Sequence, residues 1–457
     1  MSPPPNSTPP AEPPPAEPQS AEPQSAEPQS AVDGAFDEAF DEACDGAFDR
    51  PFDRSGTGSS KWASAGAEAD PDRIPLGLAD MDLPGPPAVG AALAARVAHP
   101  ALGYTVPDPR DRELVAAWYL ARHGVAVDPD WVLLLPFGPR TAVRLLLETL
   151  LAAADRPPGP VLLPTPEYGG FAPTCRAAGV PYEEVPLALE PDGYRLPVAE
   201  FARRAARPLT AVLLSSPHNP SGRVWRRAEI RALAETAAGA GGVLLSDEVH
   251  ADLVHPDAPR RHPVAVEAAG ELARATVTLH STGKTFNTTG LPSAFVLVPD
   301  PGLRARLTEV MAGYGLWEGG LLTRVAQNAA LESGGPWLDG LLARLAGSRD
   351  LALTALRWLA PAAVPSPPQA SYLLWLDAVA LGLPAEGARR LLLERCGLDL
   401  QDGIGFGAAG RGFLRLNYAL PRPRLIMALD RLSRAGLCGG RPSEPRPPAD
   451  RHPDGGG

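Results

Sequence analysis

The stretch Ser281-Thr-Gly-Lys-Thr-Phe-Asn287 directly follows an apolar run, Thr276-Val-Thr-Leu-His280. Three more short apolar runs end in polar or turn-forming residues: Val161-Leu-Leu-Pro164, Ala211-Val-Leu-Leu-Ser-Ser216 and Val243-Leu-Leu-Ser-Asp247. Such runs are typical of buried strands in a mainly parallel sheet. Stretches of helical period lie around them, at residues 87–97, 112–122, 141–153, 227–240 and 303–312. The alternation predicts an α/β sheet with helices on both faces, and a ligand site beyond the carboxyl ends of the strands.

The composition avoids lysine. Only Lys61 and Lys284 are lysines among 42 basic residues, which leaves forty arginines. A lysine retained in such a chain is a candidate for chemistry that arginine cannot perform, because a desolvated amine can form a Schiff base. Lys284 is expected on a loop at a strand end, where its amine would meet a ligand. The alternative is a surface lysine without a role.

Two further motifs precede the lysine segment, each after an apolar run: Pro217-His-Asn-Pro-Ser-Gly-Arg-Val-Trp225 and Ser246-Asp-Glu-Val-His-Ala-Asp-Leu253. In this order the three segments resemble the fold-type I pyridoxal-phosphate enzymes of the class I/II aminotransferase superfamily. The second motif looks more narrowly like the MalY/PatB subfamily of cystathionine and cysteine-S-conjugate β-lyases. So do Phe52-Asp-Arg with Thr57-Gly-Ser-Ser-Lys-Trp62, Leu78-Ala-Asp-Met-Asp82, and Gly103-Tyr104. The resemblance extends from about residue 52 to about residue 436.

The resemblance implies a large domain with a mainly parallel, seven-stranded sheet and a smaller α+β domain built from both chain ends. The expected segments are 52–100 and 311–440 for the smaller domain and 101–310 for the large, cofactor-binding domain. The family is expected to form homodimers.

The resemblance also implies roles for residues near the lysine. Lys284 would carry pyridoxal 5'-phosphate as a Schiff base and move the proton at the substrate α-carbon. Asp247 would keep the pyridine nitrogen protonated, and Asn219 would donate to the phenolic oxygen. His250, which the lyase subfamily carries where many aminotransferases have tyrosine, would reach the same oxygen. Tyr168 would stack on the ring. If the resemblance is set aside, each of these side chains could equally serve as a helix cap, a turn residue or a core residue.

A phosphate site is predicted where Phe137-Gly-Pro-Arg-Thr141 opens a helix, since free amides and the helix dipole attract an anion there. Gly138, Pro139 and Arg140 form this turn, although Pro139 departs from the family pattern and lacks an amide donor. Ser281 is expected to add a hydroxyl. By resemblance, Tyr104 reaches the phosphate bound by the neighbouring subunit, so the homodimer would contribute to each site.

Arg415, in Gly412-Phe-Leu-Arg-Leu-Asn-Tyr418, matches the family arginine that binds the substrate α-carboxylate, an anion that suits a planar guanidinium. Asp82 is expected at the substrate entrance. Gly77 stands where the subfamily commonly has an aromatic residue, and Leu83 replaces a usual phenylalanine. We expect these two departures to widen the pocket for a bulkier substrate.

The favoured activity is α,β-elimination from cysteine S-conjugates, which releases a thiol, pyruvate and ammonia. An aminotransferase would use the same residues, and a pathway-specific enzyme acting on a cysteine adduct also fits the pocket departures. A regulator that uses the fold only to bind a ligand is a third alternative, against which the intact set of reactive residues argues. The substrate side chain is not readable.

Charge and cysteine content exclude other classes of function. Residues 1–55 carry twelve acids and two arginines, which accounts for −10 of the formal net charge of −11. The rest of the chain is almost neutral, so a nucleic-acid surface is not expected. The four cysteines lack metal-site spacing, no metal site is expected, and no apolar run is long enough to cross a membrane. Together with the absence of a signal-like start, these features favour a cytoplasmic enzyme.

Both ends of the chain are expected to be tails, at residues 1–51 and 441–457. Residues 11–30 repeat Ala-Glu-Pro-Gln-Ser, a Pro-rich acidic pattern without residues to bury. Residues 34–53 hold four Phe-Asp units, Ala35-Phe-Asp37, Ala39-Phe-Asp41, Ala47-Phe-Asp49 and Pro51-Phe-Asp53. These aromatic units either bind something or belong to a dispensable tail, and the tail is the favoured interpretation.

Overall fold

The computed structural model describes residues 48–106, 108–152, 157–316 and 320–434. Most of the predicted tail residues, 1–47 and 441–457, therefore lie outside the described residues. The strands, in chain order, are β1 (Ile74–Pro75), β2 (Val132–Leu135), β3 (Val161–Thr165), β4 (Tyr182–Pro186), β5 (Ala188–Glu190), β6 (Gly193–Arg195), β7 (Ala211–Ser215), β8 (Val243–Asp247), β9 (Thr276–His280), β10 (Ala294–Leu297), β11 (Leu373–Asp377), β12 (Leu398–Asp399), β13 (Gln401–Asp402) and β14 (Phe413–Asn417).

The helices are α2 (Ser60–Ala65), α3 (Pro87–Ala98), α4 (Pro109–Trp118), α5 (Pro139–Ala152), α6 (Phe171–Ala177), α7 (Val198–Arg204), α8 (Arg227–Gly239), α9 (Ala265–Ala268), α10 (Thr282–Thr285), α11 (Pro301–Gly313), α12 (Leu321–Ser333), α13 (Gly335–Leu359), α14 (Ala388–Cys396) and α15 (Arg422–Arg434). Helix α4 continues as a π-helical turn, Tyr119–His123. A helix is present at each of the five predicted positions, and each predicted apolar run is a strand. None of the described helices combines the length and apolar character that a bilayer crossing demands.

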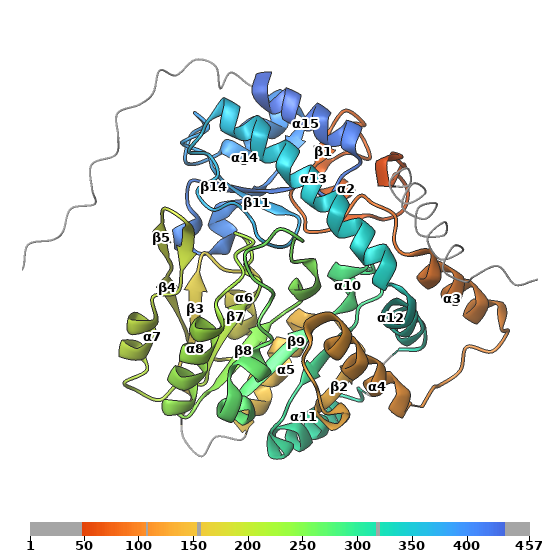
Figure 1. Cartoon of the computed structure of the whole chain (residues 1–457), viewed down its shortest axis with the longest axis vertical. Coiled ribbons are helices and arrows are strands. Elements are labelled where there is room, and N and C mark those ends of the chain that lie inside the picture. The colour runs from red at the N-terminus through yellow and green to blue at the C-terminus, as the bar shows by residue number, and fades with distance from the viewer. Residues whose placement is uncertain (1–47, 107, 153–156, 317–319, 435–457) are drawn as a thin grey trace, which may run out of the picture. The chain divides into compact units, whose positions relative to one another are not determined.

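The central sheet has seven strands in the order β2-β10-β9-β8-β7-β3-β4 (Figure 1). Strand β10 is antiparallel to both of its neighbours, while the pairs from β9 to β4 are parallel. In the register of β7 and β8, Ser215 lies beside Asp247, so both residues stand at the carboxyl edge of the sheet. The mainly parallel, seven-stranded sheet is confirmed.

Alternating strand residues supply two hydrophobic layers, because successive side chains in a strand point to opposite faces. On one face, Leu163, Leu213 and Leu245 pack with buried residues of α5, α6 and α11. On the other face, Leu162 and Leu214 pack with buried residues of α7, α8 and α9. The sheet is thus covered on both sides, and its carboxyl edge is left for a ligand.

A second region contains the antiparallel sheet β11-β14-β13 and the two-stranded parallel sheet β1-β12. The latter joins Ile74 to Leu398, residues from opposite ends of the chain. The predicted domain boundaries themselves stay predictions. However, Phe48 is 1% exposed in the same core as Leu374 and Leu416, so the packed structure begins before the predicted boundary at residue 52.

Candidate active site

A cavity of about 280 Å³ opens at the carboxyl edge of the central sheet. Ten of the predicted site residues line it: Gly138, Pro139, Arg140, Tyr168, Asn219, Asp247, His250, Ser281, Lys284 and Arg415. These residues come from loops after β2, β3, β7, β8 and β9 and from strand β14. Leu78, Ala79, Thr141, Ser215, Thr289 and Leu291 complete much of the wall. The structure therefore brings the polar strand-end residues to one enclosed space.

Lys284 lies on the short helix α10, whose N-cap Ser281 accepts a hydrogen bond from the Gly283 amide. The Lys284 ammonium donates to the carbonyl oxygen of Ala79, which also accepts from the hydroxyl of Tyr372 at 3.1 Å. Burial lowers the pKa of Lys284 to about 8. An amine that faces a cavity and has a pKa near neutral pH is suited to Schiff-base formation and proton transfer.

Asp247 ends β8 and is 5% exposed. Its carboxylate accepts from the Val249 amide at 3.2 Å, and no ion pair of Asp247 occurs among the described residues. Burial raises the pKa of Asp247 to about 6. A buried carboxylate without a cation is costly, so this site favours a ligand that brings a protonated nitrogen.

Glu167 is a buried carboxylate beside Asp247 that the sequence interpretation missed. It accepts from the Tyr168 amide at 2.6 Å, the Ser215 amide at 3.0 Å and the Ser215 hydroxyl. Burial raises its pKa to about 8, and the charge of Asp247 adds to the rise. The Ser215 hydroxyl in turn accepts from the Asn219 amide at 3.0 Å. Glu167 thus ties together the backbone of two predicted cofactor residues, Tyr168 and Asn219.

Arg415 is a buried cation, 4% exposed, that faces the cavity from β14. It donates to Asn219 Oδ1 at 3.0 Å and to the carbonyl oxygen of Gly77 at 2.9 Å, and its guanidinium lies 4.9 Å from the centre of the Phe406 ring. Its Nε–H has no partner and no acidic residue pairs with it within the described part of the chain. Burial lowers the pKa of Arg415 to about 10. A carboxylate ligand would satisfy this group.

His250 lines the cavity in the loop after β8 and is 3% exposed. Its Nδ1 lies 3.1 Å from the hydroxyl of Ser371, and its ring packs edge-on against Tyr372. Burial, reinforced by the nearby Lys284 and Arg415 cations, lowers the pKa of His250 to about 3. The imidazole is therefore neutral and can exchange a hydrogen bond without adding charge.

The anion end of the cavity is formed by the start of α5 and the cap of α10. Gly138, Pro139, Arg140 and Thr141 line it from one side, and Ser281 lines it from the other. A Cβ atom built on Gly138 meets nothing within 4 Å, so the backbone faces open space. Helix starts of this length attract anions through their unpaired amides.

Asp82 is a buried residue that forms ion pairs. Its carboxylate is 3.0 Å from Lys61 Nζ and 2.8 Å from Arg54, and it accepts from the Trp62 indole at 3.2 Å. It does not line the cavity. Two cations and an indole satisfy Asp82, which therefore holds the 79–82 segment in place. Its predicted place at the substrate entrance stays a prediction.

Gly77 and Leu83, the two departures expected to widen the pocket, do not line the cavity. A Cβ atom at Gly77 would lie 3.1 Å from the Gln401 amide nitrogen and 3.2 Å from the Leu400 carbonyl carbon. Glycine allows the two backbone segments to pack closely there. Leu83 is 1% exposed and belongs to the hydrophobic core. Neither departure bears on the size of the site.

Tyr104 lies away from the cavity in this single chain and is 95% exposed. It lines a surface depression with Val106, Leu321 and Arg324. Leu102 and Val106 beside it are also exposed. This loop presents apolar side chains on the surface, as a subunit contact would.

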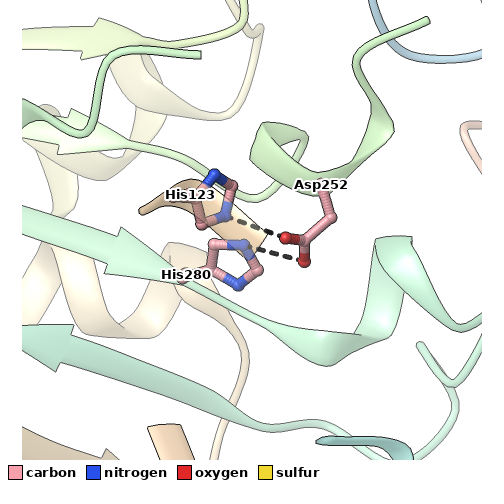
Figure 2. Close-up of side chains that lie close together, drawn as sticks. All are labelled: His123, Asp252 and His280. Atoms are coloured by element: carbon pink, nitrogen blue, oxygen red, sulfur yellow. Dashed lines mark hydrogen bonds and ion pairs between the residues drawn. The ribbon is translucent and has the colours of Figure 1, made fainter. Parts of the chain in front are cut away.

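Asp252, the last acid of the Ser246–Leu253 motif, is buried, and its carboxylate faces the imidazoles of His123 and His280 (Figure 2). Oδ1 accepts from the Trp118 indole and lies 3.0 Å from His123 Nε2; Oδ2 accepts from Thr285 at 2.8 Å and lies 3.2 Å from His280 Nε2. Burial alone would raise the pKa of Asp252, but the two imidazoles hold this pKa well below its usual range. Two imidazoles and a carboxylate can also bind a metal, but both oxygens already accept protein donors. The cluster therefore fixes α10, which carries the cavity lysine.

These features fit pyridoxal phosphate. The unpartnered Nε–H of Arg415 suits the carboxylate of an amino acid, and the unpaired Asp247 carboxylate suits a protonated ring nitrogen. The start of α5 suits a phosphate, and Lys284 offers the amine. Each group meets a complementary residue in one cavity.

Comparisons with known proteins agree with this assignment. A family model described as aminotransferase class I and II matches residues 72–432. Cystathionine beta-lyase PatB of Bacillus subtilis strain 168 is 32% identical over 383 residues, which cover 83% of this chain and 97% of PatB. Protein MalY of Escherichia coli strain K12 is 29% identical over 366 residues, 78% of this chain and 89% of MalY. The crystal structure of cystalysin from Treponema denticola, which contains a pyridoxal 5'-phosphate cofactor, has a TM-score of 0.77 and 25% identity, covering 85% of this chain and 98% of cystalysin.

Proposed function

This chain belongs to the aminotransferase class I and II family, and from that premise we propose that it is a pyridoxal-phosphate-dependent carbon–sulfur β-lyase. Its substrates would be cysteine S-conjugates such as cystathionine, and its products a thiol, pyruvate and ammonia. The observation that carries the proposal is the meeting of Lys284 and the partly unpaired Arg415 in one cavity. Similarity to PatB, which is named a cystathionine beta-lyase, favours the lyase over the aminotransferase.

Pyridoxal phosphate, when bound, supplies a ring that accepts electrons from the substrate α-carbon. Arg415 binds the substrate α-carboxylate, because a planar guanidinium matches two carboxylate oxygens and its Nε–H lacks a protein partner. This contact orients the α-proton. Lys284, whose pKa burial lowers to about 8, then takes that proton, so that the β-thiolate can leave.

Asp247 and Asn219 support the reaction from the protein side. Asp247 holds a proton at the pyridine nitrogen, and its burial keeps water away from that ion pair. Asn219 uses its Oδ1 to accept from Arg415, which leaves its amide nitrogen for the phenolic oxygen. The Asn219–Arg415 bond thereby links the cofactor contact to the substrate contact.

The proposal is tested by mixing the protein and pyridoxal phosphate with L-cystathionine and a panel of S-substituted cysteines. Pyruvate and free thiol in equal amounts, with persistence of the yellow absorbance, are expected. Conversion of the cofactor to its pyridoxamine form without thiol would instead establish the aminotransferase. Lys284→Ala is the control, since it should lose both the yellow absorbance and turnover.

We further propose a homodimer in which Tyr104 of one subunit reaches the phosphate bound by the other. The exposed Leu102, Tyr104 and Val106 support a subunit contact on this loop. Tyr104→Phe should raise the pyridoxal-phosphate dissociation constant several-fold without dissociating the dimer in sedimentation. A wild-type dissociation constant in this variant, or a monomeric wild-type protein, would contradict the assignment.

A further inference from the structure

Ser371, just before β11, has a backbone conformation that serine rarely adopts. Its φ angle is 72°, in the left-handed region, and the residue is 2% exposed. Asn287 also has a positive φ, but asparagine adopts this conformation more readily than serine does. Such a conformation costs free energy and persists where the surrounding contacts determine it, which is common at functional sites.

Backbone hydrogen bonds hold Ser371 against the loop that carries His250. His250 is the N-cap of the short 3-10 turn Ala251–Leu253. The Ser371 amide donates to the Leu253 carbonyl oxygen at 2.7 Å, and the Ser371 carbonyl oxygen accepts from the Tyr418 hydroxyl at 2.8 Å. Both polar groups of the Ser371 backbone are therefore fixed, which keeps this residue in the left-handed conformation and at a set place beside His250.

The Ser371 side chain has one partner. Its hydroxyl lies 3.1 Å from Nδ1 of His250 and makes no other hydrogen bond in the described part of the chain. A neutral imidazole has one N–H. If Nδ1 carried that proton and donated to the serine oxygen, the serine hydrogen would be a buried donor without an acceptor, which is costly. If the hydroxyl instead donates to Nδ1, both groups are satisfied and the ring proton lies on Nε2.

The His250 ring lines the cavity, and its Nε2 has no hydrogen-bond partner among the described residues. The ring is also held by its edge-on contact with Tyr372, at 5.9 Å between ring centres. Burial and the nearby Lys284, Arg415 and His280 lower the pKa of His250 to about 3. The imidazole is therefore neutral near pH 7, and the position of its single proton decides whether Nε2 donates or accepts.

We propose that Ser371 is a positioning residue for His250: its hydroxyl fixes the ring proton on Nε2, where the N–H donates to the phenolic oxygen of bound pyridoxal phosphate. The other tautomer would present a lone pair to the same oxygen, and two acceptors do not bond. The inference rests on the proposed pyridoxal-phosphate function. It adds the residue that makes His250 a donor at that site.

The first test follows the yellow absorbance of full-length protein, loaded with pyridoxal phosphate, as the pH is raised. A donor to the phenolic oxygen withdraws negative charge that otherwise holds the proton of the Schiff base. Ser371→Ala should therefore raise the pH midpoint of the yellow absorbance by about 0.5–1 unit. An unchanged midpoint would overturn the proposal.

Ser348→Ala is the matched control for the loss of a buried hydroxyl. The Ser348 hydroxyl accepts from Arg344 at 2.6 Å, and Ser348 does not line the cavity. This variant should keep the wild-type pH midpoint. A midpoint that moves as far as in Ser371→Ala would count against a specific role of Ser371.

Ser371→Gly separates the hydroxyl from the backbone conformation, because glycine adopts a positive φ without strain. Ser371→Ala keeps the strain, so the two variants should differ in thermal stability while their pH midpoints shift equally. Midpoints that follow stability instead would reduce Ser371 to a structural role and overturn the proposal. Ser371→Thr keeps a hydroxyl and should keep the wild-type midpoint even where its branched side chain lowers stability.

A second measurement reads the ring proton in the wild-type holoenzyme and needs no folded Ser371 variant. Nitrogen-15 NMR of histidine-labelled protein should show a protonated Nε2 and an unprotonated Nδ1 for His250, assigned by the signals that His250→Gln lacks. A protonated Nδ1 would overturn the proposal. A wild-type protein that gains no yellow absorbance from pyridoxal phosphate would contradict the proposed function and this inference with it, whereas a yellow protein whose midpoint ignores Ser371 contradicts this inference alone.

Discussion

Replacing Glu167 with glutamine should change how the stability of the protein depends on pH. Glu167 is 2% exposed and lies beside Asp247. Its carboxylate accepts from the Ser215 amide at 3.0 Å and from the Tyr168 amide at 2.6 Å. Glutamine has the shape of the neutral acid and, like it, one oxygen that only accepts. Glutamine cannot ionise, so its contribution to stability does not depend on pH. Its amide nitrogen faces a backbone donor, and the cost of that contact is the same at every pH.

The size of the effect follows from the two pKa values. Burial raises the pKa of Glu167 from 4.5 to about 8 in the folded protein. The folded chain then binds more protons than the unfolded chain between these values, so stability falls as the pH rises through them. The slope reaches ~1.4 kcal/mol per pH unit, and the integral from pH 5 to pH 8 is roughly 3.5 kcal/mol. The Glu167→Gln variant does not lose stability in this way. Its unfolding free energy, relative to that of the wild type, should therefore rise by roughly 3.5 kcal/mol from pH 5 to pH 8.

The assay is urea denaturation of both proteins, freed of cofactor, at pH 5, 6, 7 and 8. The difference in unfolding free energy should move steadily in favour of Glu167→Gln as the pH rises. Glu271→Gln, which removes an exposed carboxylate, controls for the loss of one charge. A difference that stays flat, or that moves toward the wild type, would show that Glu167 is ionised in the folded protein across this range.

Other variants test the remaining parts of the site. Lys284→Ala should abolish the yellow absorbance of bound pyridoxal phosphate, and an unchanged spectrum would remove Lys284 from its role. Arg415→Lys keeps the charge but loses a second donor to the substrate carboxylate, so kcat/KM should fall roughly 30- to 150-fold, about 2–3 kcal/mol, with the main change in KM. Asp252→Asn should lower the unfolding free energy by about 1–3 kcal/mol in urea, because the amide nitrogen that replaces one carboxylate oxygen cannot accept from the Trp118 indole or the Thr285 hydroxyl; an unchanged unfolding free energy would mean that these hydrogen bonds do not stabilise the fold. Deletion of residues 1–46 keeps Phe48 and Asp49 and should leave kcat unchanged, whereas a large loss of kcat would give the removed segment a part in turnover.

Much of the large domain is readable from the sequence, because buried parallel strands and their helices have strong local patterns. Strands β8 and β9 begin and end at the predicted residues, and α8 differs from prediction by one residue. The reversal of β10 was not predicted. Its run Ala294–Leu297 has the same apolar character as its parallel neighbours, and apolar character does not encode strand direction.

The sequence predicts the part of the candidate site that lies at strand ends, and it does not reveal contacts between residues far apart in the chain. Asp247, Lys284 and Asn219 follow strands and therefore converge at one sheet edge. Nothing near Asp82 in the sequence indicates that it is paired. In the structure it forms ion pairs with Lys61 and Arg54, which lie more than twenty positions away. Such pairs come from tertiary packing, which periodicity does not reveal.

The two lysines show which signal in the sequence could have found this packing. Both are directed at one short segment: Lys284 donates to the carbonyl oxygen of Ala79, and Lys61 donates to that of Asp80 at 2.8 Å. Lys61 is 1% exposed, and it also meets the Asp82 carboxylate at 3.0 Å. A compact ammonium can donate to a backbone carbonyl and a carboxylate from one point, whereas a planar guanidinium needs a wider, flatter partner. In a chain that otherwise uses arginine, a retained lysine therefore marks a buried point contact, and of the two lysines Lys284 lines the cavity.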